Sequence, residues 1–250
     1  MTVRFSVERW AAWAPGLSDH SVWRAWLREP CAISQQEEPP LVEMPAMIRR
    51  RVERLGRVAL QATYWGQGDC VQCPIVFASR RGDIGRSIQL LRQLATGEPL
   101  SPAAFSTSVH NAIGALYSIA NAHTGSYTAI AAGEETIEAA FVEALGQLAD
   151  GASEVLLVYY DEPLPVPYDV FQDGVDLRFE FVRAMAYRIR LVETGGYSLL
   201  SGPVIVDKNH DHDAKALPPD VAVLNFLVSD TERQYVHTVG ARRWEWSHHA

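Results

Sequence analysis

The feature that most constrains the fold is a near-continuous apolar run at residues 154–160, which reads EVLLVYY. Such a run is typical of a strand inside a sheet that is covered on both faces. Two shorter runs of strand length precede it, at 74–79 and 126–131. Segments with helical character separate these strands, at 82–95, 107–122 and 134–148. Strands and helices in alternation predict an α/β architecture.

The flanking regions predict further elements. We expect a strand and a helix within 1–30 and another helix over 45–64. In the expected helix over 82–95, four apolar residues are spaced to form one face, and they are Ile84, Ile88, Leu91 and Leu94. The helix over 107–122 is rich in small residues, so we expect it to lie centrally, close to a neighbouring backbone.

Two proline-containing breaks, at 35–40 and 161–167, interrupt these elements. We place the main internal boundary at the second break, because its three prolines prevent helix continuation and most sheet pairing. The prediction is a lobe over 1–160 and a C-terminal extension over 161–250 that packs on the same core.

The extension has a different pattern from the lobe. Strands are expected at 187–192 and 204–206, and one or two antiparallel strand pairs should pack on the lobe. The segment 219–228 fits either a short helix or a strand. The segment 233–246 is expected to be extended, with Trp244 and Trp246 on the same face.

Composition and charge exclude several classes of protein. Among the 250 residues, 22 are Lys or Arg and 30 are Asp or Glu, giving a net charge of −8. This argues against a nucleic-acid binder and against a surface that binds anionic lipid. No stretch approaches the roughly 20 apolar residues of a membrane span, and the N-terminus lacks the apolar core of a signal peptide. Three cysteines do not make a disulfide framework. A cytoplasmic protein is the expectation.

Two short patterns resemble parts of metal sites. Cys70-x-x-Cys73 has the spacing of a zinc or redox half-site, but no second cysteine pair exists and a strand follows it directly. His210 and His212 lie in an alternating histidine and aspartate segment that fits a solvated loop. For both patterns we favour chance spacing over a functional metal or redox role. We expect no metal and no cofactor, since no P-loop, dinucleotide fingerprint or G-x-S-x-G elbow is present.

The segment 99–162 carries several small motifs in a recognisable order. They are Ser101-Pro102, Phe105, Asn111, Gly125, the strand at 126–131, the helix from about Glu134, Gly151 and the strand at 154–160. In this order they resemble the first half of a β-ketoacyl synthase of the thiolase-like superfamily, over roughly residues 45–160. The resemblance implies half of a thiolase-like fold, a three-layer α/β/α arrangement with a mixed, mostly parallel sheet, plus a strand-rich C-terminal extension.

The chain departs from this family at the nucleophile. The family has a cysteine at the start of the long helix, and the corresponding position here is about Glu134. Residues 131–135 contain no Cys, Ser or Thr. A carboxylate is favourable at a helix N-terminus, but it cannot replace a thiolate in taking up an acyl chain. The family's two catalytic histidines and its glycine-rich loop also have no counterpart in 161–250. We therefore expect no condensing activity from this chain alone.

A ketosynthase-like chain without these catalytic residues resembles the chain-length factors of the superfamily. Chain-length factors pair with an active ketosynthase and shape its acyl pocket. The chain looks most like the short type found with aryl polyene and xanthomonadin-type pigment clusters. That type carries a similar Ala131-Ala132-Gly133-Glu134 segment and a Trp-x-Trp pair, here Trp244 and Trp246. The resemblance implies a heterodimer with a full-length β-ketoacyl synthase in fatty-acid or polyketide-type synthesis, and indirect contact with an acyl carrier protein.

The resemblance also assigns roles to particular residues. The strand at 126–131 should pair with the partner's sheet, and the helix at 107–122 should face the partner's acyl tunnel. The implied pocket and interface residues are Phe105, His110, Asn111, Ile113, Tyr117, Tyr127, Thr128 and Ile130. Phe105, His110, Ile113 and Tyr117 have an alternative as ordinary core residues of an amphipathic helix. The alternative for Glu134 is that of a favourable first-turn acid.

Two other functions stay open. One is a homodimeric module that binds an acyl chain or a carrier protein. The other is a decarboxylase or acyltransferase that uses Glu134 or the His210–His212 loop.

Overall fold

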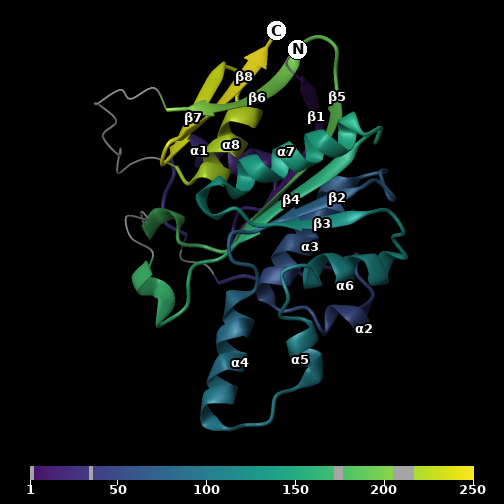
Figure 1. Ribbon diagram of the computed structural model, residues 1–250, viewed down its shortest axis with the longest axis vertical. Helices are drawn as coiled ribbons and strands as arrows, with labels where there is room; N and C mark the ends of the chain where they lie inside the picture. Colours follow the sequence, from purple (N-terminus) through teal and green to yellow (C-terminus); the bar gives the residue numbers. More distant parts are fainter. Residues whose placement is uncertain (1–2, 34–35, 172–176, 205–216) are drawn as a thin grey trace.

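The apolar run that dominates the sequence forms strand β4 (Val155–Asp161), and all of its residues are buried. The computed structural model describes residues 3–33, 36–171, 177–204 and 217–250, and within them eight strands form one mixed sheet (Figure 1). The strand order is β3-β2-β4-β5-β1-β6-β8-β7. The other strands are β1 (Phe5–Trp13), β2 (Ile75–Ala78), β3 (Tyr127–Ile130), β5 (Arg183–Leu191), β6 (Gly196–Pro203), β7 (Gln234–Val239) and β8 (Arg242–His249).

Parallel pairing is confined to one part of the sheet. β2 lies between β3 and β4 and is parallel to both, whereas β5, β1, β6, β8 and β7 join through antiparallel pairs. The mixed α/β class is therefore confirmed, but the expectation of a mostly parallel sheet is wrong. The reason is the route of the chain. Parallel neighbours need a crossover connection, usually a helix, and the described residues between β4 and β5 form only 3₁₀ turns.

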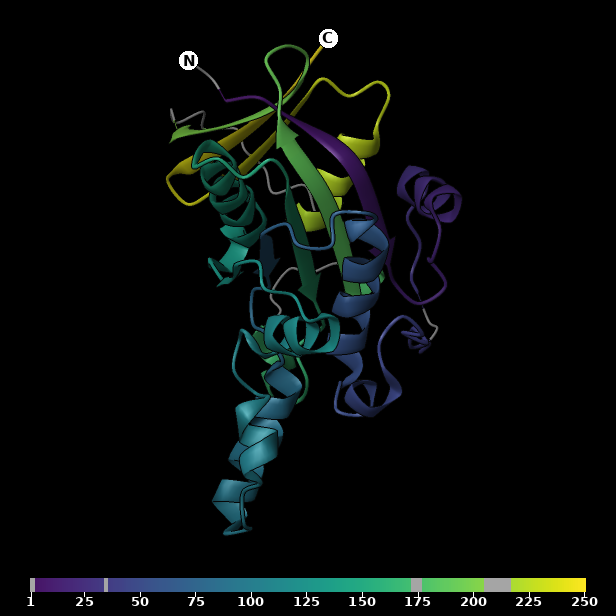
Figure 2. The same cartoon turned by 90° about the vertical axis from the view of Figure 1, so that its right-hand side faces the viewer.

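Helices cover both faces of the sheet and make three layers (Figures 1 and 2). Helices α3 and α6 pack on one face, and α1, α7 and α8 pack on the other. The helices are α1 (His20–Arg28), α2 (Ala46–Arg49), α3 (Arg54–Gln67), α4 (Ile84–Thr96), α5 (Pro102–Ser106), α6 (Ala112–Asn121), α7 (Thr136–Ala149) and α8 (Pro219–Val228).

The side chains of β2 show why its sequence is apolar throughout. Ile75 and Phe77 belong to the core under α3 and α6, while Val76 and Ala78 belong to the core under α7. Alternate side chains of a strand point to opposite faces, so a strand covered twice needs an apolar residue at every position. β4 follows the same rule from Val155 to Tyr160.

Helices α4 and α5 project beyond the sheet as an arm, which we define as residues 84–106 (Figures 1 and 2). Asp83 begins the arm by accepting the amide N–H of Arg86, and Gly97 ends α4 in the left-handed conformation with φ +73°. The expected apolar face of this helix is only partly buried. Ile88 is buried, but Leu91 and Leu94 are exposed, because the arm projects away from the sheet (Figure 1).

Two expected helices have different bounds. The segment 45–64 contains α2 and the first part of α3, with a break between them. Val52 is buried in this break and its side chain comes close to Gly56, where a Cβ would lie 2.7 Å from it. The segment 107–122 is helical only from Ala112, since α5 and a turn precede it.

The extension is part of the same sheet. β5 lies between β4 and β1, so the C-terminal half supplies central strands rather than a separate layer of strand pairs. The segment 219–228 is a helix, α8, and Trp244 and Trp246 are both buried, as expected for residues on one face of β8. No strand is described at 204–206, of which only Val204 is among the described residues. The division at residue 160 stays a prediction.

Within the described ranges, no helix is long and apolar enough to cross a membrane.

Candidate functional site

The candidate site lies at the carboxyl ends of β3, β2 and β4. These strands are parallel, so the segments that follow them meet at one edge of the sheet. Ligands of open α/β sheets bind in the crevice outside this edge. The segment after β2 begins with Ser79 and Arg80, the segment after β3 runs to Glu134, and β4 ends at Asp161 and is followed by Glu162.

A tight turn forms the start of α7. Gly133 has φ +59°, which a glycine adopts without strain, and residues Gly133–Glu135 form a 3₁₀ turn. The Thr136 hydroxyl accepts the Ala132 N–H at 3.0 Å and donates to the Gly133 carbonyl at 2.7 Å. The expected helix start at about Glu134 is thus a 3₁₀ turn that leads into α7.

Glu134 points away from the core. Its side chain is 63% exposed, and its Oε1 lies 3.8 Å from Nη2 of Arg80. A carboxylate at this helix start is favoured by the N-terminal backbone N–H groups and by the guanidinium. The arrangement holds a negative charge, and the turn after β3 offers no hydroxyl or thiol between residues 131 and 135.

The next two acids are held by the C-terminal hairpin β7–β8. Glu135 Oε1 accepts a 2.8 Å hydrogen bond from Nε1 of Trp244. Glu138 is fully buried, and its Oε1 lies 2.7 Å from Nδ1 of His237. The first turn of α7 is therefore tied to residues about a hundred positions later in the sequence.

A buried polar network lies beneath the edge. Asp161 accepts hydrogen bonds from the hydroxyls of Ser79, at 3.3 Å, and Tyr159, at 3.2 Å. Burial raises the pKa of Asp161, and the charge of Arg183 acts in the opposite direction. Arg183 in turn makes a two-point ion pair with Asp220, at 2.5 and 2.9 Å. This network joins β2, β4, β5 and α8.

Glu162 occupies the base of the arm. Burial, and after it the charge of Asp83, raise its pKa to about 7, although Arg54 partly offsets the shift. Its Oε1 lies 3.7 Å from the position that a Cβ on Gly85 would take. A carboxyl group with this pKa changes charge near neutral pH at the point where α4 leaves the sheet.

The expected pocket residues fall into two groups. Phe105 and Asn111 are exposed, and His110 is half-buried with its Nε2 3.0 Å from the Ser79 carbonyl oxygen. Ile113 and Tyr117 are instead buried in the core between α6, α3 and the sheet, where the Tyr117 hydroxyl donates to Gln67. The structure thus places His110 next to the candidate site and the last two residues inside this chain's own core.

The expected interface residues lie on β3, an edge strand. Tyr127 packs on the α6 side, where a Cβ on Gly114 would lie 2.7 Å from its ring. Thr128 and Ile130 face α7, since Gln147 of α7 lies 3.5 Å from the Thr128 hydroxyl and Ile130 packs on the core of that face. Only one side of β3 is paired in the described chain, with β2.

Comparison with known proteins gives the family. A model of the β-ketoacyl synthase N-terminal domain matches residues 23–247. The chain belongs to this family. The resemblance found in the sequence is therefore confirmed, and no curated protein sequence matches the chain.

Solved structures show the same ketosynthase-like fold. The complex of the ketosynthase ApeO with its chain length factor ApeC from Xenorhabdus doucetiae contains a chain 26% identical to this one, with a TM-score of 0.81 and a match that covers 99% of each chain. The ishigamide ketosynthase/chain length factor is 16% identical, with a TM-score of 0.61, over 81% of this chain and 68% of that chain. A β-ketoacyl synthase from Burkholderia phymatum STM815 is 12% identical, with a TM-score of 0.62, over 82% and 65%.

Arg80, Asp161 and Glu162 of this ketosynthase-family chain were not among the site residues expected from the sequence. Their signal was present, because each follows or ends one of the parallel strands, where polar side chains gather at the site. The contacts of Glu135 and Glu138 with the hairpin had no local signal.

The Cys70-x-x-Cys73 pattern lies outside the site. Cys73 donates its thiol hydrogen to the Cys70 carbonyl at 3.1 Å, and burial raises the pKa of both thiols. Among the residues that the structure describes, no group of three or more His, Cys, Asp or Glu side chains is arranged to hold a metal ion. The segment with His210 and His212 lies outside those residues.

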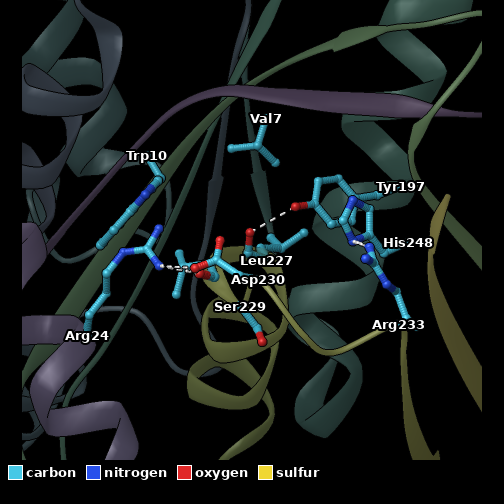
Figure 3. A pocket seen from close by; sticks show the side chains of 10 residues that line it. Val7, Trp10, Arg24, Tyr197, Leu227, Ser229, Asp230, Arg233 and His248 are labelled. Atoms are coloured by element: carbon cyan, nitrogen blue, oxygen red, sulfur yellow. Dashed lines mark hydrogen bonds and ion pairs between the residues drawn. The ribbon is translucent and has the colours of Figure 1, made fainter. Parts of the chain in front are cut away.

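Two open hollows lie around β1 rather than at the site. One of them, with a cavity volume of about 360 Å³, has Trp10 and Arg24 on one side and Tyr197, Arg233 and His248 on the other (Figure 3). Arg233 donates to Nδ1 of His248 at 2.8 Å, and the pKa of His248 is lowered by burial and by this neighbouring charge. None of the expected site residues lines this hollow.

Proposed function

We propose that this chain is a cytoplasmic, non-catalytic ketosynthase-like subunit, a chain-length factor. In this role it pairs with an active β-ketoacyl synthase and shapes the acyl pocket of that enzyme in fatty-acid or polyketide-type synthesis, of the aryl polyene kind. The observation that carries the proposal is the start of α7. Glu134, which by the family resemblance stands at about the nucleophile position, is exposed and paired with Arg80, and residues 131–135 contain no Cys, Ser or Thr to take up an acyl chain.

The open edge of β3 supports pairing with a second chain. The carbonyls of Ser126 and Ile130 accept from β2, and alternate residues of a strand direct their backbone groups to opposite sides. The N–H and C=O groups of Tyr127 and Ala129 therefore face away from β2. An unpaired strand edge of this kind is a template for another strand, and a ketosynthase with its own β3-like edge fits it.

The similarity to the ApeO–ApeC complex supports the choice of partner. The match covers 99% of a chain in that complex, whereas it covers 68% and 65% of the chains in the two other ketosynthase structures. The acyl carrier protein would then be reached mainly through the ketosynthase partner, because this chain carries a net charge of −8 and carrier proteins are themselves usually acidic.

Three exposed apolar side chains of the arm support the same proposal. Leu91, Leu94 and Phe105 are each more than half exposed. Exposed apolar patches of this kind mark interaction sites. Together with His110 and Asn111, Phe105 is the part of the expected pocket that is open to a partner, whereas Tyr127, Thr128 and Ile130 lie on β3, where the partner's strand would pair.

Co-expression tests the proposal. The tagged chain would be produced with the full-length ketosynthase from its own genome, purified by the tag and measured by native mass spectrometry. A 1:1 complex is expected. A stable homodimer that leaves the ketosynthase unbound would contradict the proposal and favour a homodimeric binding module.

Ala129→Pro provides the matched test of the strand edge. It removes an N–H that faces away from β2, and an edge strand tolerates proline at such a position. We expect the variant to keep the far-UV circular dichroism of the wild type and to lose the ketosynthase. A variant that still binds with unchanged affinity would exclude pairing through β3.

A further inference from the structure

The C-terminal hairpin β7–β8 holds the first turn of α7 at two points. Trp244 of β8 donates its indole N–H to Glu135, and His237 of β7 donates Nδ1–H to Glu138. The two donors are cross-strand neighbours, since His237 is paired with Trp244 in the register of the hairpin. They therefore act from one rigid element on one turn of helix.

Two groups of the hairpin contact the Glu135 carboxylate, the neutral indole of Trp244 and the charged guanidinium of Arg242. Its Oε1 accepts from Trp244 at 2.8 Å and lies 3.5 Å from Nε of Arg242. The Arg242 guanidinium also lies over the Trp244 ring, 5.6 Å from its centroid. A hydrogen bond to a charged group is stronger and shorter than a neutral one, so this contact fixes the direction of the Glu135 side chain.

The contact at Glu138 is buried. The side chain is fully inaccessible, and its second oxygen, Oε2, has no hydrogen-bond partner among the described residues. A buried carboxylate without a donor is strongly unfavourable, which makes His237 the group that keeps Glu138 in place. Packing alone does not require this pair, because Trp246 of β8 already anchors the hairpin, with its ring 4.8 Å from that of Phe141 on α7.

We propose that His237 and Trp244 are positioning residues that fix the turn Gly133–Glu135, and with it the direction of Glu134 and the carboxyl end of β3. This inference rests on the proposed function, because that turn follows the strand at which the partner would bind. The hairpin then sets the shape of this chain's contribution to the acyl pocket, and the length of the product depends on two side chains that do not touch the acyl chain.

The first arm of the test uses the full chain alone. Trp244→Phe keeps the aromatic ring and removes the donor to Glu135. Hydrogen exchange at the amides of residues 133–138 should be about tenfold faster, the factor that corresponds to the loss of about 1.4 kcal/mol of local stability. Exchange in β4 should stay as in the wild type. Unchanged exchange at 133–138 would overturn the proposal, whatever the ketosynthase does.

The second arm measures the products of the reconstituted complex. Equal amounts of complex, quantified by native mass spectrometry, are compared by chromatography of the released acyl products. Trp244→Phe should change the ratio of the longest product to shorter ones by threefold or more. Arg243→Gln is the control, because the described contact of Arg243 is with Glu245 in its own strand, and it should leave the ratio unchanged.

Two variants of His237 distinguish a positioning role from a general role in folding. His237→Leu removes the donor and leaves Glu138 buried without one, whereas His237→Asn places an amide N–H close to the position of Nδ1. The asparagine variant should restore wild-type exchange and products, and the leucine variant should not. If the leucine variant fails to fold, Trp244→Phe and His237→Asn still decide the matter. A complex that forms and makes wild-type products with Trp244→Phe contradicts this inference, while failure of the wild-type chain to bind the ketosynthase contradicts the proposed function.

Discussion

Oε1 of Glu134 lies 3.8 Å from Nη2 of Arg80, across the carboxyl ends of two parallel strands. In the ketosynthase family the residue at this helix start carries the nucleophile. Here this helix start carries Glu134, which is 63% exposed and paired with Arg80. The relationship is the basis of the proposal that the chain acts on the pocket of a partner.

Glu134→Gln should have little effect on folding. The ion pair is solvent-exposed, and such pairs contribute about 0–1 kcal/mol to stability. We expect the free energy of unfolding, measured by urea denaturation at neutral pH, to change by less than about 1 kcal/mol. A larger loss would show that Glu134 is part of the structural framework rather than an exposed substitute for the nucleophile.

Asp220→Asn should be strongly destabilising. Asp220 and Arg183 form a two-point ion pair, and both side chains are almost completely buried. Removing one partner of a buried pair costs about 3–5 kcal/mol, because the other charge is left uncompensated. Urea denaturation checks the prediction. The control is Arg243→Gln, which also replaces a charged side chain by an amide but at an exposed position. Equal midpoints for the two variants would contradict it.

Glu162 should make stability depend on pH. Its pKa in the folded chain is about 7, above the ordinary value of 4.5, so the folded state binds more protons than the unfolded state between these pH values. This contribution to stability is fully present below pH 4.5 and is lost as the pH rises through about 7. Glu162→Gln should flatten the fall in melting temperature between pH 5 and pH 8, and a slope equal to that of the wild type would contradict the assignment.

Phe105→Ala and Ile113→Ala should distinguish a residue that lines the acyl pocket from a residue that packs in the core of this chain. Phe105 is 62% exposed and Ile113 is 7% exposed. Ile113→Ala should cost about 2–5 kcal/mol of stability, whereas Phe105→Ala should stay within about 0.5 kcal/mol. If Phe105 lines the acyl pocket, only its variant changes product length without changing the melting temperature. The measurements are thermal unfolding of the chain and product analysis of the complex.

The central strands and the long helix were predictable from sequence, for a physical reason. β2, β3, β4 and α7 begin and end within about two residues of their predicted limits, since strands covered on two faces and amphipathic helices leave strong local patterns. The shared face of Trp244 and Trp246 was predictable because of the two-residue period of a strand, but the segment 233–246 was expected as one extended stretch and instead forms β7 and most of β8.

The remaining features depend on contacts between distant residues. The contact from Trp244 to Glu135 spans 109 positions, and nothing in either local sequence specifies it. The exposure of Leu91 and Leu94 reflects the arm's projection from the sheet, which the periodicity of α4 does not encode. For the site, the sequence placed Glu134 at the helix start, but its ion pair with Arg80 depends on the order of β3 and β2 in the sheet.

One pair of assays tests the central claim most directly. The complex with the ketosynthase would be prepared in two forms, one with the partner's nucleophilic cysteine replaced by alanine and one with Glu134→Gln in this chain. Condensation of an acyl thioester with a malonyl thioester is then measured for each. The account predicts no condensation from the first complex and near wild-type condensation from the second. Condensation that survives loss of the cysteine, or that disappears with Glu134→Gln, would contradict it.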